Sequence, residues 1–220
     1  MKNLIKSETY KLFRLPLYIF LLFLAAVFAY FRIDFGFIPF ETLSVEYWFI
    51  DTSVNHICIA VLIFILTADF VGGDFSNCAL MPSLLCGEPR QSLIFAKYIA
   101  IFRGVLPILA VYELMGARTI FYAKGWIGCS STSGIILAFF INNFYCAVED
   151  LVIISVAVLM SLVIKNKILL VLIETFVFFI IYIKITNIHI PFIVAPFISA
   201  EVIAVSLYAS DCIFEKKDLI

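Results

Sequence analysis

Charged side chains interrupt apolar runs that are long enough to cross a membrane, among them Arg103, Glu149, Asp150, Glu174 and Glu201. A charge at the bilayer centre costs roughly 2.5–3.5 kcal/mol on insertion scales, so each should face a bundle interior, a cavity or another charge. These charges either line a path for a cationic substrate, exchanging partners as the bundle opens, or form static buried pairs. A pair of Arg103 with a carboxylate of the fourth or fifth run is one example, and both interpretations stay open.

Motifs for catalysis, metal binding or nucleotide binding are not found in the sequence. His56 and His189 are far apart and lack companion ligands at metal-binding spacing. There is no HExxH pattern and no GxxxxGK[ST] phosphate loop. We therefore expect no catalytic residue, no metal site and no ATP site in this chain. Most of the cysteines are interpreted as small apolar residues, and a disulfide between Cys129 and Cys146 is left open.

The composition is that of a membrane protein. Hydrophobic residues make up 64% of the chain and charged residues 14%, whereas soluble domains carry roughly 25% charged residues. The mean hydropathy is +1.12. A chain of 220 residues holds about six spans of ~20 residues with their loops. We predict an all-α fold, with one transmembrane domain over residues 1–220.

Apolar runs place the spans, and basic residues orient them. The predicted spans are residues 15–31, 53–71, 93–114, 144–164, 168–185 and 192–213, each a helix because lipid leaves no other partner for the backbone. The run 135–141 either lengthens the fourth span or forms an outer interfacial helix. The short link at residues 165–167 predicts that spans four and five are antiparallel neighbours.

Lysine and arginine are distributed unevenly between the two sides. With the N-terminus inside, ten lie in inner segments and four in outer ones, which favours a cytoplasmic N-terminus. Six spans return residues 214–220 to the cytoplasm as a tail. We therefore expect a multi-pass protein of a bacterial plasma membrane.

Residues 1–14 are predicted to form an amphipathic helix at the inner membrane surface. Met1, Leu4, Ile5 and Leu12 share one face of a helical wheel, and the lysines lie on the other. Glu8 sits inside the apolar arc. It either reaches out to water while supporting the first turns, or pairs with a basic group from another inner segment.

The segment between the second and third spans predicts a short surface helix. Gly72-Gly73 would let the chain turn sharply as it leaves the membrane, and Gly87 and Pro89 would end the element. The helix of ~10 residues between them has an apolar face that a partner protein could hold. Alternatively, it only rests in the interface.

Three motifs, in this order around six apolar runs, resemble the permease subunits of type-2 ABC exporters. They are the opening stretch Lys6–Leu12, the stretch from Asp74 through Arg90 to Lys97, and the closing stretch 214–218. The resemblance is to the small six-span kind associated with peptide, bacteriocin or lantibiotic export or immunity. The chain departs from that pattern at residues 74–77, where the family more often has Glu and a Gly-Thr pair, and at Pro82.

The resemblance implies that this chain and a separate ATPase carry different parts of the function. Glu8, Lys11 and Leu12 would belong to an elbow helix. A coupling helix would dock on a cytoplasmic ABC ATPase through Asp74, Phe75, Ala79, Leu80, Leu84, Leu85 and Arg90. ATP and Mg²⁺ would be bound by two copies of that ATPase, with no cofactor in this chain. The other expected partners are a second permease, identical or homologous, and membrane lipid, with no nucleic acid.

The expected cargo is an amphipathic peptide such as a toxin, bacteriocin or lantibiotic, or another amphipathic compound. Two other functions stay open. One is an ion-coupled secondary carrier or channel that uses the intramembrane carboxylates. The other is an assembly or immunity membrane protein with no transport of its own.

Overall fold

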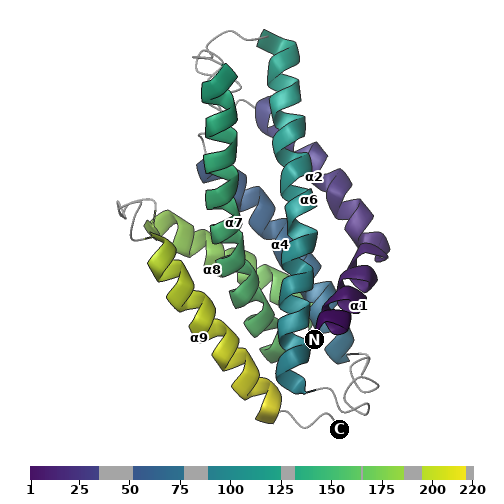
Figure 1. Cartoon of the computed structure of the whole chain (residues 1–220). Helices are drawn as coiled ribbons and strands as arrows, with labels where there is room; N and C mark the ends of the chain where they lie inside the picture. The colour runs from purple at the N-terminus through teal and green to yellow at the C-terminus, as the bar shows by residue number, and fades with distance from the viewer. Residues whose placement is uncertain (35–51, 77–88, 125–131, 165, 186–194, 217–220) are drawn as a thin grey trace.

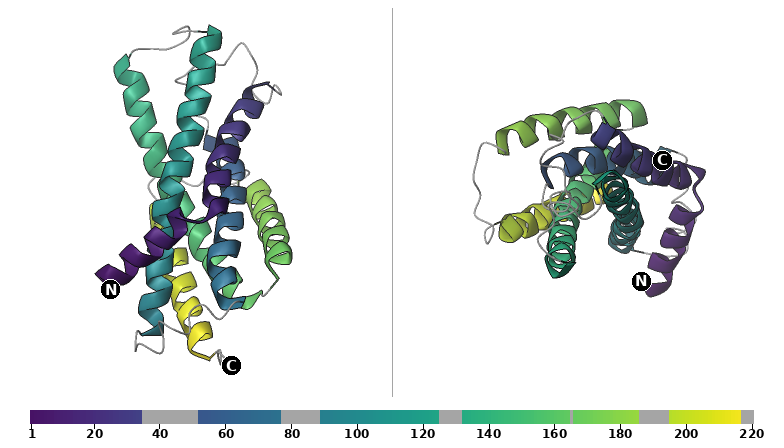
Figure 2. Two further views of the ribbon diagram at one scale, coloured as in Figure 1. Left: turned by 90° about the vertical axis from the view of Figure 1, so that its right-hand side faces the viewer. Right: turned by 90° about the horizontal axis from the view of Figure 1, so that it is seen from above.

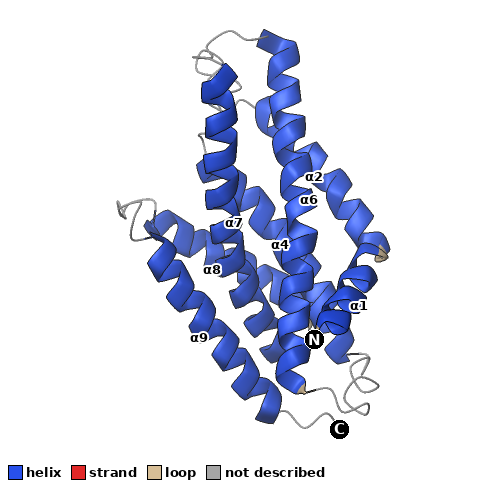
Figure 3. Ribbon diagram, viewed as in Figure 1, coloured by secondary structure: helices blue, strands red, loops and turns tan. Residues whose placement is uncertain are grey.

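The computed structural model describes residues 1–34, 52–76, 89–124, 132–164, 166–185 and 195–216. These residues form the helices α1 (Lys2–Phe13), α2 (Pro16–Asp34), α4 (Thr52–Ser76), α6 (Arg90–Lys124), α7 (Thr132–Val163), α8 (Lys167–Ile185) and α9 (Ala195–Lys216) (Figure 1). The described part of the chain contains no strand (Figure 3). The predicted all-α fold is confirmed, and each predicted apolar run overlaps one helix.

Two helices within the described residues are long and apolar enough to cross a membrane by themselves, namely Gln91–Tyr122 and Cys146–Val163. The bent pair Lys2–Phe13 and Pro16–Phe31 makes a third if it is counted as one span. Two or three helices that could cross a membrane are what is expected of a membrane protein. The run 135–141 lies inside α7, so it lengthens the fourth apolar run and is not a separate helix.

The corner between α1 and α2 has a local cause. The residue before a proline is disfavoured in the helical region, and proline itself is well suited to the first helical position. Pro16 therefore begins α2, and the two helix axes differ by 65°. The corner turns α1 onto the side of α6 (Figure 2).

The helices α4 and α6 hold the core together. Helix α4 packs against α7, α8 and α2, while α6 packs against α1 and α2. Alanines are fully buried along these contacts: Ala25, Ala29, Ala60, Ala100 and Ala157. Small residues let helix backbones approach closely, which is how helices associate where lipid removes the hydrophobic driving force.

The pair Gly72-Gly73 does not make the predicted turn. Helix α4 continues through both glycines to Ser76, so that prediction is wrong. Ion pairs of Asp69 and Asp74 hold this end of the helix in place. Gly73 instead permits a close approach, because a Cβ there would lie 3.0 Å from Lys167 Nζ.

The short link before α8 is closed by a cap. The Asn166 Oδ1 accepts hydrogen bonds from the backbone N–H of Ile168 at 3.0 Å and of Leu169 at 3.2 Å, which satisfies two donors of the first turn. Helices α7 and α8 contact each other, as predicted, but α8 packs mainly against α4. Figure 2 shows α8 at the outside of the bundle beside α4.

Candidate functional site

Four charged side chains from three helices meet in one buried cluster, which we call the ion cluster: Glu8 and Lys11 of α1, Asp74 of α4 and Lys97 of α6. The Lys97 ammonium donates a hydrogen bond to Glu8 Oε2 at 2.8 Å and another to Asp74 Oδ2. Lys11 Nζ donates to the same Asp74 oxygen at 2.5 Å. The cluster therefore balances two positive and two negative charges.

Lys97 is the centre of the ion cluster. Its side chain is only 2% exposed, and a buried ammonium must have its charge and its donors matched. Two carboxylates supply this, and the ring of Phe70 on α4 lies 4.3 Å from Nζ, within the range of a cation–π contact. Lys11 is 41% exposed and is the peripheral member.

The position of Glu8 decides between the two interpretations of the first segment. Glu8 and Leu12 are the buried residues of α1, so the acid does lie on the face that packs inward. It pairs with Lys97, which belongs to another segment assigned to the inner side. The interpretation that Glu8 pairs with a basic group is confirmed.

Apolar packing fixes α1 beside the ion cluster. Leu12 is fully buried and lies over Gly104 of α6, where an added Cβ would come 2.6 Å from Leu12 Cδ2. Tyr18, two residues into α2, donates its hydroxyl to the Gly104 carbonyl at 2.8 Å. Glycine at 104 therefore allows α1 to come close enough for its charges to reach Lys97.

The electrostatics of Asp74 follow from these contacts. Burial by itself would raise the pKa of the Asp74 carboxyl, but the ammonium groups of Lys97 and Lys11 outweigh it and hold the pKa below the usual 3.8. Because the Asp74 carboxyl is more acidic in the folded protein than in the unfolded chain, its ionisation stabilises the fold in full at pH values above its unfolded-state pKa. That stabilisation is lost as the pH falls through the folded-state pKa.

Measuring stability at several pH values tests the direction of this pKa shift. We expect the free energy of unfolding of Asp74→Asn to fall below that of the wild type at neutral pH, and the difference to shrink as the pH falls below about 4. Thermal unfolding of the detergent-purified chain at several pH values measures it. Both proteins keep Glu8, so their difference isolates Asp74. A difference that stays constant, or grows, down to about pH 3 would contradict the assignment.

The predicted docking residues lie mostly outside the described residues. This holds for Ala79, Leu80, Leu84 and Leu85. Phe75 falls in the last turn of α4 and Arg90 begins α6, and Asp74 belongs to the ion cluster. Both helix ends that flank the predicted coupling segment are therefore described, and the segment itself is not. Cys129 also lies outside the described residues.

The five intramembrane charges do not form one group. Asp150 is 1% exposed and Glu174 4% exposed, as expected for residues that face the bundle interior. Arg103, Glu149 and Glu201 are exposed on this chain, and that they face a bundle interior, a cavity or another charge stays a prediction. Arg103 directly precedes Gly104, at the level where α1 packs, and a long cationic side chain there can extend toward lipid headgroups.

Static pairing of Arg103 also finds no support. Among the described residues, no ion pair joins Arg103 to a carboxylate of α7 or α8. An ion pair does tie α8 to α4, because Lys167 Nζ lies 2.6 Å from Asp69 Oδ1. Both of its side chains are more than a third exposed, so it contributes little to stability.

Sequence reasoning assigned no role to two residues that the structure brings into contact, namely Lys97, the centre of the ion cluster, and Phe70, whose ring lies over its ammonium. It also gave no role to Glu113, which is fully buried in α6. The usable signal for Lys97 was its place in the apolar stretch from Ile94 to Ile101. A buried cation in such a stretch needs an anionic partner. Glu8 is the corresponding case of an acid among apolar residues, which needs a cationic partner.

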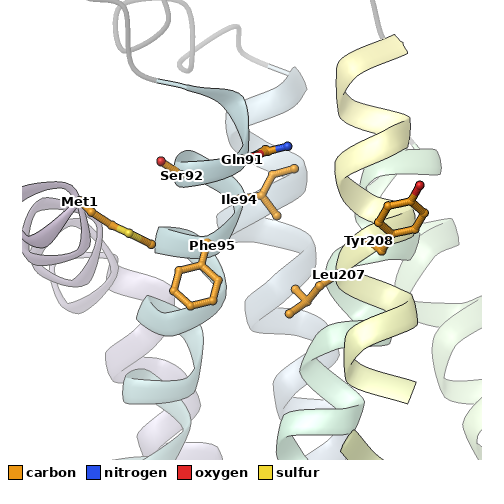
Figure 4. Close-up of a pocket in the computed structure, with 7 residues that line it drawn as sticks. All are labelled: Met1, Gln91, Ser92, Ile94, Phe95, Leu207 and Tyr208. Carbon is orange, nitrogen blue, oxygen red and sulfur yellow. The ribbon is translucent and has the colours of Figure 1, made fainter. Parts of the chain in front are cut away.

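A groove of about 400 Å³ lies beside the first turns of α6. Figure 4 shows its lining: Met1, Gln91, Ser92, Ile94, Phe95, Leu207 and Tyr208. These residues come from the start of the chain, from α6 and from α9. Within the described part of the chain, no side chain of the ion cluster lines this groove, and no lining side chain is a Lys, Arg, Asp or Glu, so the groove and the ion cluster are separate features.

Comparisons of the chain with protein-family models, with curated proteins and with solved structures find no match. A functional assignment therefore starts from the ion cluster and from the motifs in the sequence.

Proposed function

We propose that this chain is the transmembrane permease subunit of a type-2 ABC exporter, with six spans and both ends in the cytoplasm. The observation that carries the proposal is the ion cluster. Glu8 and Lys11 come from the first of the motifs that resemble this family, and Asp74 and Lys97 come from the second. Lys11 and Asp74 are 63 residues apart, and Glu8 and Lys97 are 89 apart, so no local constraint of the backbone brings the two motifs together.

The ion cluster gives the proposal a physical mechanism. Residues 77–88 connect Asp74, near the end of α4, to α6, which carries Lys97. A force applied to this segment by a docked ATPase would act on both helix ends. Because α1 is bound to the same two residues, it would move with them. The ion cluster thus acts as the joint between the coupling segment, α1 and the bundle.

ATP binding and hydrolysis belong to a partner in this proposal. Two cytoplasmic ATPase subunits would bind ATP and Mg²⁺, and two permease chains, identical or homologous, would form the path in a bacterial plasma membrane. Exposed aromatic side chains on the helices, such as Phe23 and Phe176, suit an amphipathic cargo that enters sideways from lipid. An amphipathic peptide is the proposed cargo class.

Affinity purification from the native cells in mild detergent tests the proposal. Mass spectrometry should find a stoichiometric partner that carries a GxxxxGK[ST] loop. Replacing the lysine of that loop in the partner should abolish export while the complex stays intact. A chain that purifies alone, or only with copies of itself, would remove the main support for the exporter assignment.

Substitutions in the coupling segment give a sharper result. Leu80→Asp or Leu84→Asp should lose the ATPase during purification, because an apolar contact with the partner would be replaced by a desolvated charge. Ser83→Asp is the matched control, since it adds the same charge to the same segment at a polar position. Thermal unfolding of all three variants should match the wild type. If the leucine variants retain the ATPase, the docking assignment is wrong.

An ion-coupled carrier is the second candidate, and the burial of Asp150 and Glu174 favours it. Such a carrier needs no ATPase. Transport that stops when the proton gradient is collapsed, but continues when ATP hydrolysis in the partner is blocked, would select this function. The reverse pattern selects the exporter.

A further inference from the structure

Glu174 is a buried carboxyl within the apolar helix α8. It lies seven residues after Lys167, which corresponds to roughly 10 Å along a helix axis. Its residue is 4% exposed, and both carboxylate oxygens are buried without a hydrogen-bond partner among the described residues. This differs from Glu8, which has a similar exposure of 8% but a lysine partner.

The helices packed against α8 offer Glu174 no described counter-charge. On α4, Asp69 is bound to Lys167, and Asp74 belongs to the ion cluster. On α7, the acids are Asp150, which is buried, and Glu149, which is exposed. Lys167, the described lysine nearest to Glu174 in the chain, is thus already paired, and the acids of α7 have the wrong sign to stabilise a second anion.

The α4–α8 contact places apolar groups on the face of α8 that bears Glu174. Phe178, one turn beyond Glu174, packs edge-on against Phe64 of α4, with ring centroids 5.9 Å apart. Thr67, one turn from Phe64 along α4, is fully buried, and its hydroxyl also lacks a partner among the described residues. An ionised carboxylate in such surroundings would lose its hydration with no compensation.

We propose that Glu174 is a proton-binding site in the α4–α8 contact. Its carboxyl carries a proton while α8 is packed against α4. It releases that proton to water only when the contact opens. The ligand is a proton, which neutralises a buried carboxylate to which the described residues supply neither a cation nor a donor. The inference holds whether or not the chain works with an ATPase.

Carbodiimide labelling of the full chain in lipid nanodiscs tests the inference without any substitution. Hydrophobic carbodiimides add to protonated carboxyls in apolar surroundings and not to carboxylates. Peptide mass spectrometry after treatment with dicyclohexylcarbodiimide at pH 7 should find the adduct on Glu174. Glu8 should remain unmodified, because it is equally buried but ion-paired. The adduct on Glu174 should decrease as the labelling pH is raised.

Infrared spectroscopy supplies an independent measurement. The wild type should show the carbonyl band of a protonated carboxyl, and Glu174→Gln should lose it, whereas Glu8→Gln should keep it. Glutamine mimics the neutral acid, so Glu174→Gln should unfold at the wild-type temperature. A spectrum unchanged by Glu174→Gln would overturn the proposal, as would labelling of Glu8 with none at Glu174. Protection from labelling by sodium but not by acid would replace the proton with a metal cation and would also overturn it.

Discussion

Replacing Lys97 by methionine should lower the free energy of unfolding by about 3–5 kcal/mol, the usual cost of removing one partner from a buried ion pair. Methionine matches the length of the lysine stem, so the loss would come from charge and not from a cavity. Glu8 and Asp74 would remain buried without the ammonium that both accept hydrogen bonds from. Denaturant or thermal unfolding of the purified chain in a fixed detergent measures the change.

The matched control is Lys11→Met in the same cluster. Lys11 is 41% exposed and contacts only Asp74 among the two acids, so its loss should cost no more than about 1 kcal/mol, as for other exposed pairs. If the two substitutions lowered the free energy of unfolding equally, the exposed Lys11 would contribute as much as the buried Lys97. The interpretation of Lys97 as the centre of the ion cluster would then be wrong.

Neutralising all three buried members of the ion cluster separates the effect of charge from the effect of shape. The triple variant with Glu8→Gln, Asp74→Asn and Lys97→Met should recover much of the stability that Lys97→Met loses, because no uncompensated buried charge remains. Export should stay impaired, because the joint between α1, α4 and α6 is weakened. A triple variant that exports normally would mean that packing alone couples these helices.

The sequence was most informative where a charge conflicted with its apolar neighbours. Glu8 stood inside the apolar arc of its helix, and this conflict left two interpretations open, of which the structure confirms the one with a basic partner. The partner itself could not be named from the sequence. Choosing Lys97 among the inner lysines needs the packing of α1 on α6, which depends on a 65° corner and on the absence of a side chain at Gly104.

Predictions that relied on local propensity were less successful. The flexibility of Gly72-Gly73 suggested a turn, but glycine only permits a turn, and the ion pairs at Asp69 and Asp74 keep α4 helical there. The rule that intramembrane charges face inward assumes a mid-membrane depth, and Arg103 is exposed on this chain. Depth depends on how far a helix of 35 residues extends past the bilayer, and no residue pattern specifies that extension.

Enlarging Gly104 should release α1 from α6. A Cβ at this position would lie 2.6 Å from Leu12 Cδ2 and 3.4 Å from Tyr18 Cε2. Alanine gains about 1 kcal/mol of helix propensity, which offsets part of that clash. Valine adds two methyl groups to the clash and should destabilise the fold by about 1–3 kcal/mol through overpacking. Gly72→Ala is the matched control, since a Cβ there meets nothing within 4 Å, and it should not destabilise.

A double-mutant cycle with Leu12 identifies the cause. Leu12→Ala alone should cost about 2–5 kcal/mol, because a fully buried leucine leaves a cavity. In the Gly104→Val background the same substitution should cost less, because the valine fills the space that Leu12 vacates. Reactivity of Leu4→Cys toward a water-soluble maleimide reports whether α1 has separated from α6, because Leu4 packs against the core and lies outside the ion cluster. Additive energies together with an unreactive Leu4→Cys would show that the close approach at Gly104 does not hold α1 in place, and the ion cluster would then have to hold it alone.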